Sequence, residues 1–183
     1  MIVIKNKRSK IENILKAYPG AEIFDVTSKG EYKRLSPFYP HGGIPVPFSG
    51  TVTSASVEGI WQGLKVFENE GIDFSCFTNR TMKDLKRTVR THGRCLGHQK
   101  GLGSRQLLEY IEARKEIYVP SYYWMLEHKC QKEIQFFIDL LNAGKTIVFL
   151  DYDTNGDIED YRKPLSHASL IKRYIESKIE ASH

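Results

Sequence analysis

The segment SASVEGIWQGLKVFENEG, residues 54–71, carries apolar side chains at helical spacing. They stand at Val57, Ile60, Trp61, Leu64 and Phe67. A stripe of this kind covers one face of an α-helix and packs against a core. Ser54 or Ser56 is a suitable N-cap, and Gly71 is a suitable end. The pattern therefore predicts a helix over residues 54–71.

A polar stripe runs beside the apolar one. Glu58, Gln62 and Lys65 follow i, i+4 and i+7, so they lie along one side of the same predicted helix. Such a stripe is either an ordinary solvent face or a set of ligand-facing groups. Gly59 and Gly63 flank it, and each glycine costs about 1 kcal/mol in a helix interior. Close approach of a ligand or of another backbone would explain the two glycines.

A long loop precedes this helix. Residues 36–50, SPFYPHGGIPVPFSG, contain four prolines and three glycines. No helix or central strand tolerates that density. The loop is also too apolar for a disordered segment, so it is predicted to be a packed binding loop.

The remaining patterns complete an α+β chain. Strands are predicted at residues 2–4, 21–26 and 145–150, and further helices at about 8–18, 82–92, 104–118, 121–142 and 165–179. A length of 183 residues with 40% apolar and 27% charged residues fits a folded globular protein. We expect one α+β domain over residues 1–183, predominantly helical with a few short strands.

The basic side chains are spread along a chain whose net charge is +5, except for one segment in which they are dense. Residues 83–105 contain Lys83, Lys86, Arg87, Arg90, Arg94, Lys100 and Arg105. This segment is either a solvated helix face or a contact surface for a nucleotide, a phosphorylated metabolite or nucleic acid. Its glycine-rich part is either a connector or a phosphate-binding loop, and it fits neither the dinucleotide nor the Walker pattern.

Cysteine usage points to the compartment. The three cysteines are widely spaced and form no C-x-x-C motif, which is typical of a reducing compartment and predicts a cytoplasmic protein. The apolar part of the N-terminus is too short for a signal peptide, and no apolar run approaches membrane-spanning length. We expect no membrane partner.

An acidic turn, FLDYDTNGDIEDYR, occupies residues 149–162. Asp151 and Asp153 stand where a calcium loop would begin, but Arg162 occupies the position that requires a bidentate carboxylate. A strand rather than a helix is also predicted before the turn. The segment is then either a plain acidic turn or a group of active-site carboxylates made by Asp151, Asp153 and Asp157. Neither interpretation requires a metal.

Taken in order, these features resemble the NADAR (YbiA-like) family. Residues 56–65 are similar to its S-E-H-x-x-Q-x-x-K helix, although one residue is inserted after Ser56 and Gly59 replaces the histidine. Residues 35–38 resemble its opening φSNF element, and Gly93-Arg94 resembles a short basic element that follows. The predicted helix 121–142 and the acidic turn resemble its later L-x-E…N-D region. The resemblance covers most of the chain and implies the YbiA-like fold.

The resemblance implies a hydrolase that cleaves the N-glycosidic bond between a ribose and a nitrogen. The substrate would be an ADP-ribosylated group or a ribosylamino-pyrimidine phosphate. Glu58 would stabilise the oxocarbenium-like cation and orient water, and Gln62 would hold a ribose hydroxyl. Lys65 would pair with a phosphate, tune the carboxylate, or attack the sugar carbon as an amine.

A second carboxylate would assist the departing nitrogen or the water, and Asp157 is favoured for that role. The other residues implied to contact the ligand are Arg94, Lys100, Phe38, Tyr39, Asp151 and Asp153. The partner would be an ADP-ribose-type or ribosyl-phosphate ligand, either free or on ADP-ribosylated nucleic acid or protein. No cofactor and no metal are expected.

Three other classes of protein remain as alternatives. A non-catalytic module for ADP-ribose or nucleotides would keep Arg94 and the aromatic loop but turn nothing over. A nucleic-acid-binding protein would use residues 83–105, and its affinity would fall steeply with salt. A calcium module would show a calcium-dependent rise in melting temperature that Asp151→Ala abolishes.

Overall fold

The structure is a computed structural model that describes residues 1–182. The chain divides into two compact units. The parallel-sheet unit contains Met1–Ser36 and the chain from Leu126 onward, and the inserted unit contains Pro37–Met125. The single-domain organisation expected from the sequence stays a prediction.

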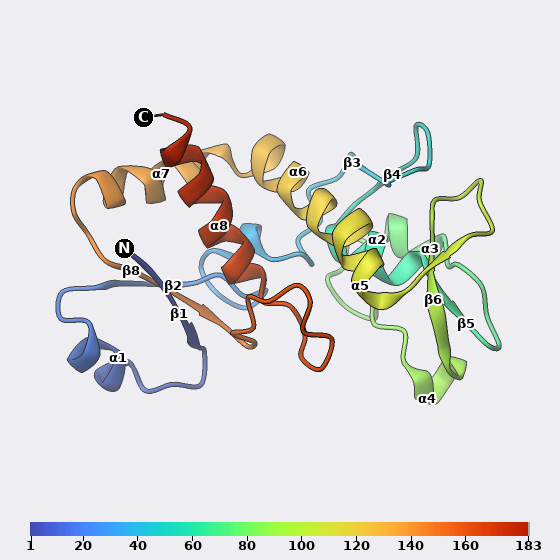
Figure 1. Cartoon of the computed structure of the whole chain (residues 1–183), viewed down its shortest axis with the longest axis horizontal. Coiled ribbons are helices and arrows are strands. Elements are labelled where there is room, and N and C mark those ends of the chain that lie inside the picture. The colour runs from blue at the N-terminus through green and yellow to red at the C-terminus, as the bar shows by residue number, and fades with distance from the viewer. Residues whose placement is uncertain (183) are drawn as a thin grey trace. The chain divides into compact units, whose positions relative to one another are not determined.

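The parallel-sheet unit is built on three parallel strands in the order β1-β8-β2 (Figure 1). The strands are β1 (Ile2–Asn6), β2 (Glu22–Asp25) and β8 (Ile147–Asp151). In the register, Ile147 of β8 lies opposite Ile2 on one side and Glu22 on the other. All five residues of β8 are buried. A central parallel strand is covered on both faces, which explains its continuous apolar run.

Helices cover this sheet on both faces. The elements are α1 (Ile11–Ala17), a 3₁₀ turn (Lys33–Leu35), α7 (Gln131–Asn142) and α8 (His167–Glu180). Val148 and Leu150 pack with Ile14 of α1, whereas the Phe149 ring lies 4.8 Å from the Phe137 ring of α7, measured between ring centroids. Successive side chains of a strand point to opposite faces, so α1 and α7 lie on opposite faces of the sheet.

The inserted unit is made of short helices and two small antiparallel sheets, β3-β4 and β5-β6-β7. Its strands are β3 (Ile44–Pro45), β4 (Thr53–Ser54), β5 (Lys65–Phe67), β6 (Cys95–Gln99) and β7 (Leu107–Leu108). Its helices are α2 (Val57–Gly63), α3 (Ser75–Thr78), α4 (Val89–His92), α5 (Tyr110–Ala113) and a π-helical turn (Arg114–Tyr118). The boundary between the units falls within α6 (Val119–Lys129).

The expected mixture of helices with a few short strands is confirmed, and so are the strands expected at residues 2–4, 21–26 and 145–150 and the helices near 8–18 and 165–179. The helix predicted at 54–71 is too long. It ends at Gly63, and residues 65–67 form β5, whose backbone pairs with β6. Val66 and Phe67 favour a strand, and the hydrogen bonds to β6 decide the outcome.

Three further helix predictions are corrected. Most of residues 82–92 is irregular, because Met82 and Asp84 have φ of 60° and 56°, outside the helical region. Residues 104–118 contain β7 and only then α5, which begins at a capping box between Glu109 and Glu112. Residues 121–142 form two helices, α6 and α7, separated at Cys130.

None of the helices in residues 1–182 is both long and apolar enough to cross a membrane. The same residues contain no cluster of three or more His, Cys, Asp or Glu side chains able to hold a metal ion.

Candidate functional site

Helix α2 is fixed at its start and along one side. The Ser56 hydroxyl accepts a hydrogen bond from the Gly59 N–H (3.0 Å), and the Glu58 N–H donates to the Pro37 carbonyl (2.8 Å). A β-carbon at Gly59 would stand 2.5 Å from the Cys76 carbonyl oxygen, and one at Gly63 would stand 2.5 Å from the Phe77 ring. The two glycines therefore allow close packing against α3. Another element, and not a ligand, accounts for them.

Glu58 and Gln62 lie one turn apart on α2 and contact each other. The Gln62 Nε2 donates to the Glu58 Oε1 at 2.7 Å. Both residues are buried: Gln62 is 4% exposed and Glu58 is 7% exposed. The adjacency predicted from the i, i+4 spacing is confirmed. Because Glu58 and Gln62 are buried, they do not belong to a solvent-facing stripe. A buried carboxylate needs hydrogen bonds or an opposite charge, and Gln62 supplies a hydrogen bond to Glu58.

Lys65 is the first residue of β5 and is half-buried. Burial lowers the pKa of its ammonium, and the nearby Glu58 carboxylate opposes that shift. The positive charges of Arg87 and Lys86 lower the pKa further. A lysine with a lowered pKa has a larger fraction of free amine near neutral pH, which is the form that acts as a nucleophile.

Arg87 joins this group, although its surroundings in the sequence did not separate it from the other basic residues of segment 83–105. Its backbone N–H donates to the Gln62 Oε1 (3.0 Å), and its guanidinium is buried. Because Oε1 accepts from Arg87, the Gln62 amide must present Nε2 to Glu58. Leu85 and Arg87 are buried in an irregular segment. Such a segment has no periodic pattern, so the burial of Arg87 could not be predicted from the sequence.

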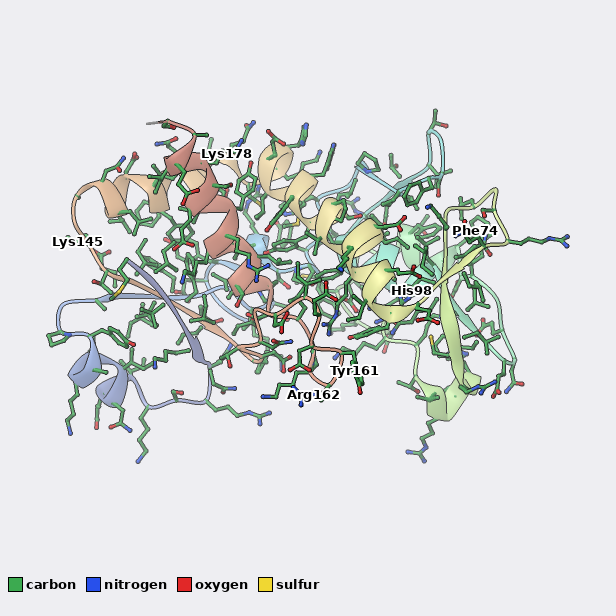
Figure 2. The ribbon with its side chains drawn as sticks, in the orientation of Figure 1. Phe74, His98, Lys145, Tyr161, Arg162 and Lys178 are labelled. Atoms are coloured by element: carbon green, nitrogen blue, oxygen red, sulfur yellow. The ribbon has the colours of Figure 1, made fainter. Side chains whose placement is uncertain are left out.

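An aromatic cluster adjoins the polar group. The Trp61 ring lies against the His98 ring at a centroid distance of 3.8 Å, with the two planes tilted by 31°. The Tyr110 and Tyr118 rings approach Trp61 at 5.9 and 5.5 Å. His98, labelled in Figure 2, lies on β6 opposite Lys65. The Arg114 guanidinium lies over Tyr110 and donates to its hydroxyl at 3.0 Å. Arg114 also begins the π-helical turn, a feature that often marks functional sites.

His98 is almost completely buried, and neither ring nitrogen makes a hydrogen bond of good geometry within residues 1–182, although the nearby Trp61 backbone opposes part of the change in its pKa. Burial lowers the pKa of His98 from its usual 6.5 to about 3, and the charge of Lys65 contributes. The imidazole is therefore neutral at physiological pH. No spacing in the sequence distinguishes this histidine from an ordinary core or surface residue.

The low pKa of His98 predicts an acid-sensitive fold. Below pH 6.5 the unfolded chain binds a proton that the folded state does not, so the stabilising contribution is complete above pH 6.5 and is lost as the pH falls toward 3. Because of this residue, we expect the free energy of unfolding to fall by about 2 kcal/mol when the pH is lowered from 7 to 5. Urea denaturation of His98→Gln should show a pH dependence weaker by that amount. His128→Gln, at an exposed position, should keep the wild-type dependence; equal slopes in all three proteins would contradict the prediction.

The other residues expected to contact a ligand in the inserted unit are more exposed. Arg94 is exposed, and its Nε lies 3.1 Å from the Glu68 carboxylate. Phe38 and Tyr39 are half-buried, and the Tyr39 ring lies 4.6 Å from the His41 ring. Lys100 forms an ion pair with Glu116 at 2.9 Å. Their contacts with a ligand stay predictions.

The aspartates of the acidic turn belong to the parallel-sheet unit. Asp151 is buried at the end of β8, where its carboxylate accepts from the Ser166 hydroxyl (2.8 Å) and the Ala168 N–H (3.2 Å) at the start of α8. Asp157 is exposed and accepts the Glu159 N–H at 2.9 Å. Asp151 therefore has a structural role that the sequence did not indicate.

The rest of the turn is held by its own hydrogen bonds. The Asn155 amide donates to the carbonyls of Asp157 and Lys163, and Arg162 forms a two-point contact with the Asp160 carboxylate. Arg162, labelled in Figure 2, therefore pairs with a carboxylate of its own turn. Asp153 is half-exposed. A meeting of Asp157 or Asp153 with Glu58 at one substrate stays a prediction.

Comparison with known protein families identifies the class to which this chain belongs. The profile described as "Family of unknown function (DUF6939)" matches residues 6–171, and the chain is a member of that family. The match includes Glu58, Gln62, Lys65 and Arg87 as well as the acidic turn. No curated protein matches the chain. The resemblance to NADAR proteins stays a prediction.

Proposed function

We propose that the protein is a hydrolase that cleaves the N-glycosidic bond between a ribose and a nitrogen. Its catalytic group would consist of Glu58, Gln62 and Lys65 of the inserted unit. The observation that carries this proposal is the buried Glu58 carboxylate, hydrogen-bonded to Gln62 and close enough to Lys65 to oppose the lowering of its pKa. A YbiA-like fold and a cytoplasmic location belong to the same proposal.

The role of Glu58 follows from the charge that develops in the reaction. Breaking the bond between the ribose C1 and a nitrogen builds positive charge on the ring, and a fixed carboxylate stabilises that charge. Burial strengthens the interaction because water does not screen it. Gln62 would keep the carboxylate in one orientation, and its second amide hydrogen would donate to a ribose hydroxyl.

Lys65 would either pair with a phosphate or act as a nucleophile, and the burial that lowers its pKa supports the second role. The free amine would attack the ribose C1 as the C1–N bond breaks, and the bonding electron pair would leave with the departing nitrogen, which takes up a proton. The resulting ribosyl-lysine opens to an imine. Water adds to the imine carbon, the amine is released, and the product is a free ribose group.

The substrate class is a ribosyl group on nitrogen that carries phosphate, such as an ADP-ribosylated group or a ribosylamino-pyrimidine phosphate. Arg94 and Lys100 would meet phosphates, and Phe38 or Tyr39 would stack on a base. Asp157 remains the proposed second carboxylate. A non-catalytic nucleotide-binding module is the alternative, and it would bind the same ligands without turnover.

The proposal is tested by incubating the protein with ADP-ribosylated guanine, ADP-ribosylated arginine and a ribosylamino-pyrimidine phosphate. We expect release of a ribose-phosphate species from at least one of them. Sodium cyanoborohydride should reduce the imine and leave a stable ribosyl adduct on the peptide that contains Lys65, detected by mass spectrometry.

Three outcomes of this experiment are informative. Binding without turnover of any of the three substrates would overturn the hydrolase and favour the non-catalytic module. Turnover without an adduct would keep the hydrolase and return Lys65 to the phosphate role. An adduct on another lysine would move the nucleophile away from β5.

A further inference from the structure

Arg87 stands in an irregular segment most of whose residues are exposed. Within residues 81–88 only Leu85 and Arg87 are buried, and Met82 and Asp84 adopt positive φ. An arginine is rarely buried unless its charge and its N–H groups find partners. The contacts of Arg87 therefore show what this segment does.

The guanidinium binds three backbone carbonyls around Lys65. Nη1 donates to the carbonyl oxygens of Gln62 (3.0 Å) and Lys65 (2.7 Å), and Nη2 donates to that of Gly71 (2.6 Å). These carbonyls belong to the end of α2, the start of β5 and the turn after β5. One side chain therefore fixes the backbone on both sides of the lysine. Arginine suits this task because its donors form a rigid planar fork.

Two further contacts keep the guanidinium in place. It lies 4.9 Å from the centre of the Phe67 ring, and Nη2 lies 3.4 Å from the Glu70 carboxylate. The ring holds the cation from one side, and the carboxylate offsets part of its charge. Substituting Arg87 would therefore remove a guanidinium that is fixed in one position, together with its contacts to the surrounding backbone.

The backbone of Arg87 acts on the carboxylate through Gln62. The Arg87 N–H donates to Gln62 Oε1 at 3.0 Å, and Gln62 Nε2 donates to Glu58 Oε1 at 2.7 Å. The position of that N–H depends on the guanidinium, which anchors the segment to the carbonyls of Gln62 and Lys65. A shift of the segment would remove the contact that orients Gln62.

We infer that Arg87 is a positioning residue, whose buried guanidinium and backbone N–H together hold Glu58, Gln62 and Lys65 in a single arrangement. The inference rests on the proposed function for its effect on turnover, but the arrangement itself can be measured without a substrate. Arg87 need not touch the reacting atoms.

The charge of Arg87 also reaches Lys65. After burial, the groups that influence the pKa of the lysine are Glu58 from α2, Cys95 from β6, and Arg87 and Lys86 from segment 81–88. His98 of β6 lies opposite the lysine in the sheet. Arg87 and Lys86 lower the pKa of Lys65, whereas Glu58 and Cys95 raise it. Removing the charge of Arg87 therefore raises the pKa of Lys65 and reduces the fraction of free amine at neutral pH.

The test compares Arg87→Met, Arg87→Lys and Arg90→Met. The last is a matched control, because Arg90 is an exposed arginine three residues away. The pH at which Lys65 becomes reactive is measured by limited labelling with acetic anhydride and peptide mass spectrometry, and the pH profile of kcat is measured on the best substrate. We expect Arg87→Met to move the Lys65 midpoint to higher pH and to lower kcat at pH 7 by about tenfold or more.

The lysine variant separates charge from geometry. Arg87→Lys keeps the charge but cannot bind the three carbonyls as a fork, so its midpoint should stay near the wild-type value while kcat falls by about tenfold. Arg90→Met should match the wild type in both measurements. A folded Arg87→Met with the wild-type midpoint and kcat overturns the inference, and so does a variant that only melts earlier.

The labelling experiment also keeps this inference distinct from the proposed function. If the wild-type protein turns over none of the substrates, the hydrolase fails, and the midpoint of Lys65 still decides the role of Arg87. If Arg87→Met does not fold, Arg87→Lys decides it through kcat, which should fall by about tenfold while the Lys65 midpoint stays near the wild-type value. A kcat equal to that of Arg90→Met would overturn the positioning role.

Discussion

Glu58→Gln is expected to abolish most of the hydrolase activity while leaving the fold intact. Glutamine has the shape of glutamate, and its side-chain carbonyl can still accept the hydrogen bond that Gln62 Nε2 now donates to Oε1. What is lost is the negative charge facing the developing cation. Loss of one such electrostatic or acid–base group costs about 10² to 10⁴ in kcat.

Glu58→Gln should also change Lys65 in a predictable direction. The Glu58 carboxylate raises the pKa of Lys65, against the effect of burial. Removing its charge therefore lowers that pKa, so more free amine is present at pH 7. The variant should label faster with acetic anhydride at neutral pH and yet turn over far more slowly. This opposite response of reactivity and turnover distinguishes lost cation stabilisation from a lost nucleophile.

Glu68→Gln is the matched control for this prediction. Glu68 is an exposed glutamate of the same unit that pairs with Arg94. Exposed pairs contribute little, so we expect kcat and the labelling of Lys65 to change less than twofold. Both variants should melt within a few degrees of the wild type. An undiminished rate in Glu58→Gln would remove Glu58 from the mechanism and with it the main support for the hydrolase.

The sequence predicted the elements whose patterns are local. The run of β-branched and other apolar residues in β8 and the helical spacing of α8 lie within single segments, and both elements were found within a few residues of their predicted ends. Sequence reasoning extended α2 beyond Gly63 because Phe67 continues its apolar stripe. The start of β5 is set by hydrogen bonds to β6, some 30 residues later in the chain. Pairings of that kind leave no periodic signal in either segment.

The candidate site divides in the same way. The contact between Glu58 and Gln62 follows from positions one turn apart on a helix, so spacing predicted it. Arg87 reaches the same group from an irregular segment 25 residues after Gln62. Nothing in its neighbourhood distinguishes it from Arg90, which is exposed. Burial of a charge depends on the tertiary structure. In the sequence, all seven basic residues of segment 83–105 look alike.

Asp151 received the opposite treatment, because the sequence placed it with the exposed aspartates of the acidic turn. The structure buries it between the end of β8 and the start of α8. Its carboxylate accepts hydrogen bonds from the Tyr152 and Ala168 N–H groups and from the Ser166 hydroxyl, and the His167 Nδ1 lies 3.1 Å away. The N–H groups at the start of a helix have no partner within the helix. Asp151 supplies one.

Asp151→Ala is therefore expected to destabilise the parallel-sheet unit strongly. The substitution leaves buried donors at Ser166 and Ala168 without an acceptor, and each unsatisfied donor costs about 1 to 3 kcal/mol. The carboxylate also holds His167, whose Nε2 lies 2.8 Å from the Val26 carbonyl oxygen. We expect a loss of about 3 kcal/mol or more in the free energy of unfolding, measured by urea denaturation with fluorescence and circular dichroism.

Asp151→Asn and Asp157→Ala define what this loss means. Asparagine keeps one acceptor oxygen in place, so Asp151→Asn should lose less than Asp151→Ala. Asp157 is exposed and accepts a single backbone N–H, so Asp157→Ala should change the unfolding free energy by less than about 1 kcal/mol. Equal stability of Asp151→Ala and Asp157→Ala would show that the buried contacts of Asp151 do not stabilise the fold. A large loss confined to Asp151 would assign it to the structure and leave Asp157 as the carboxylate to test for a role in turnover.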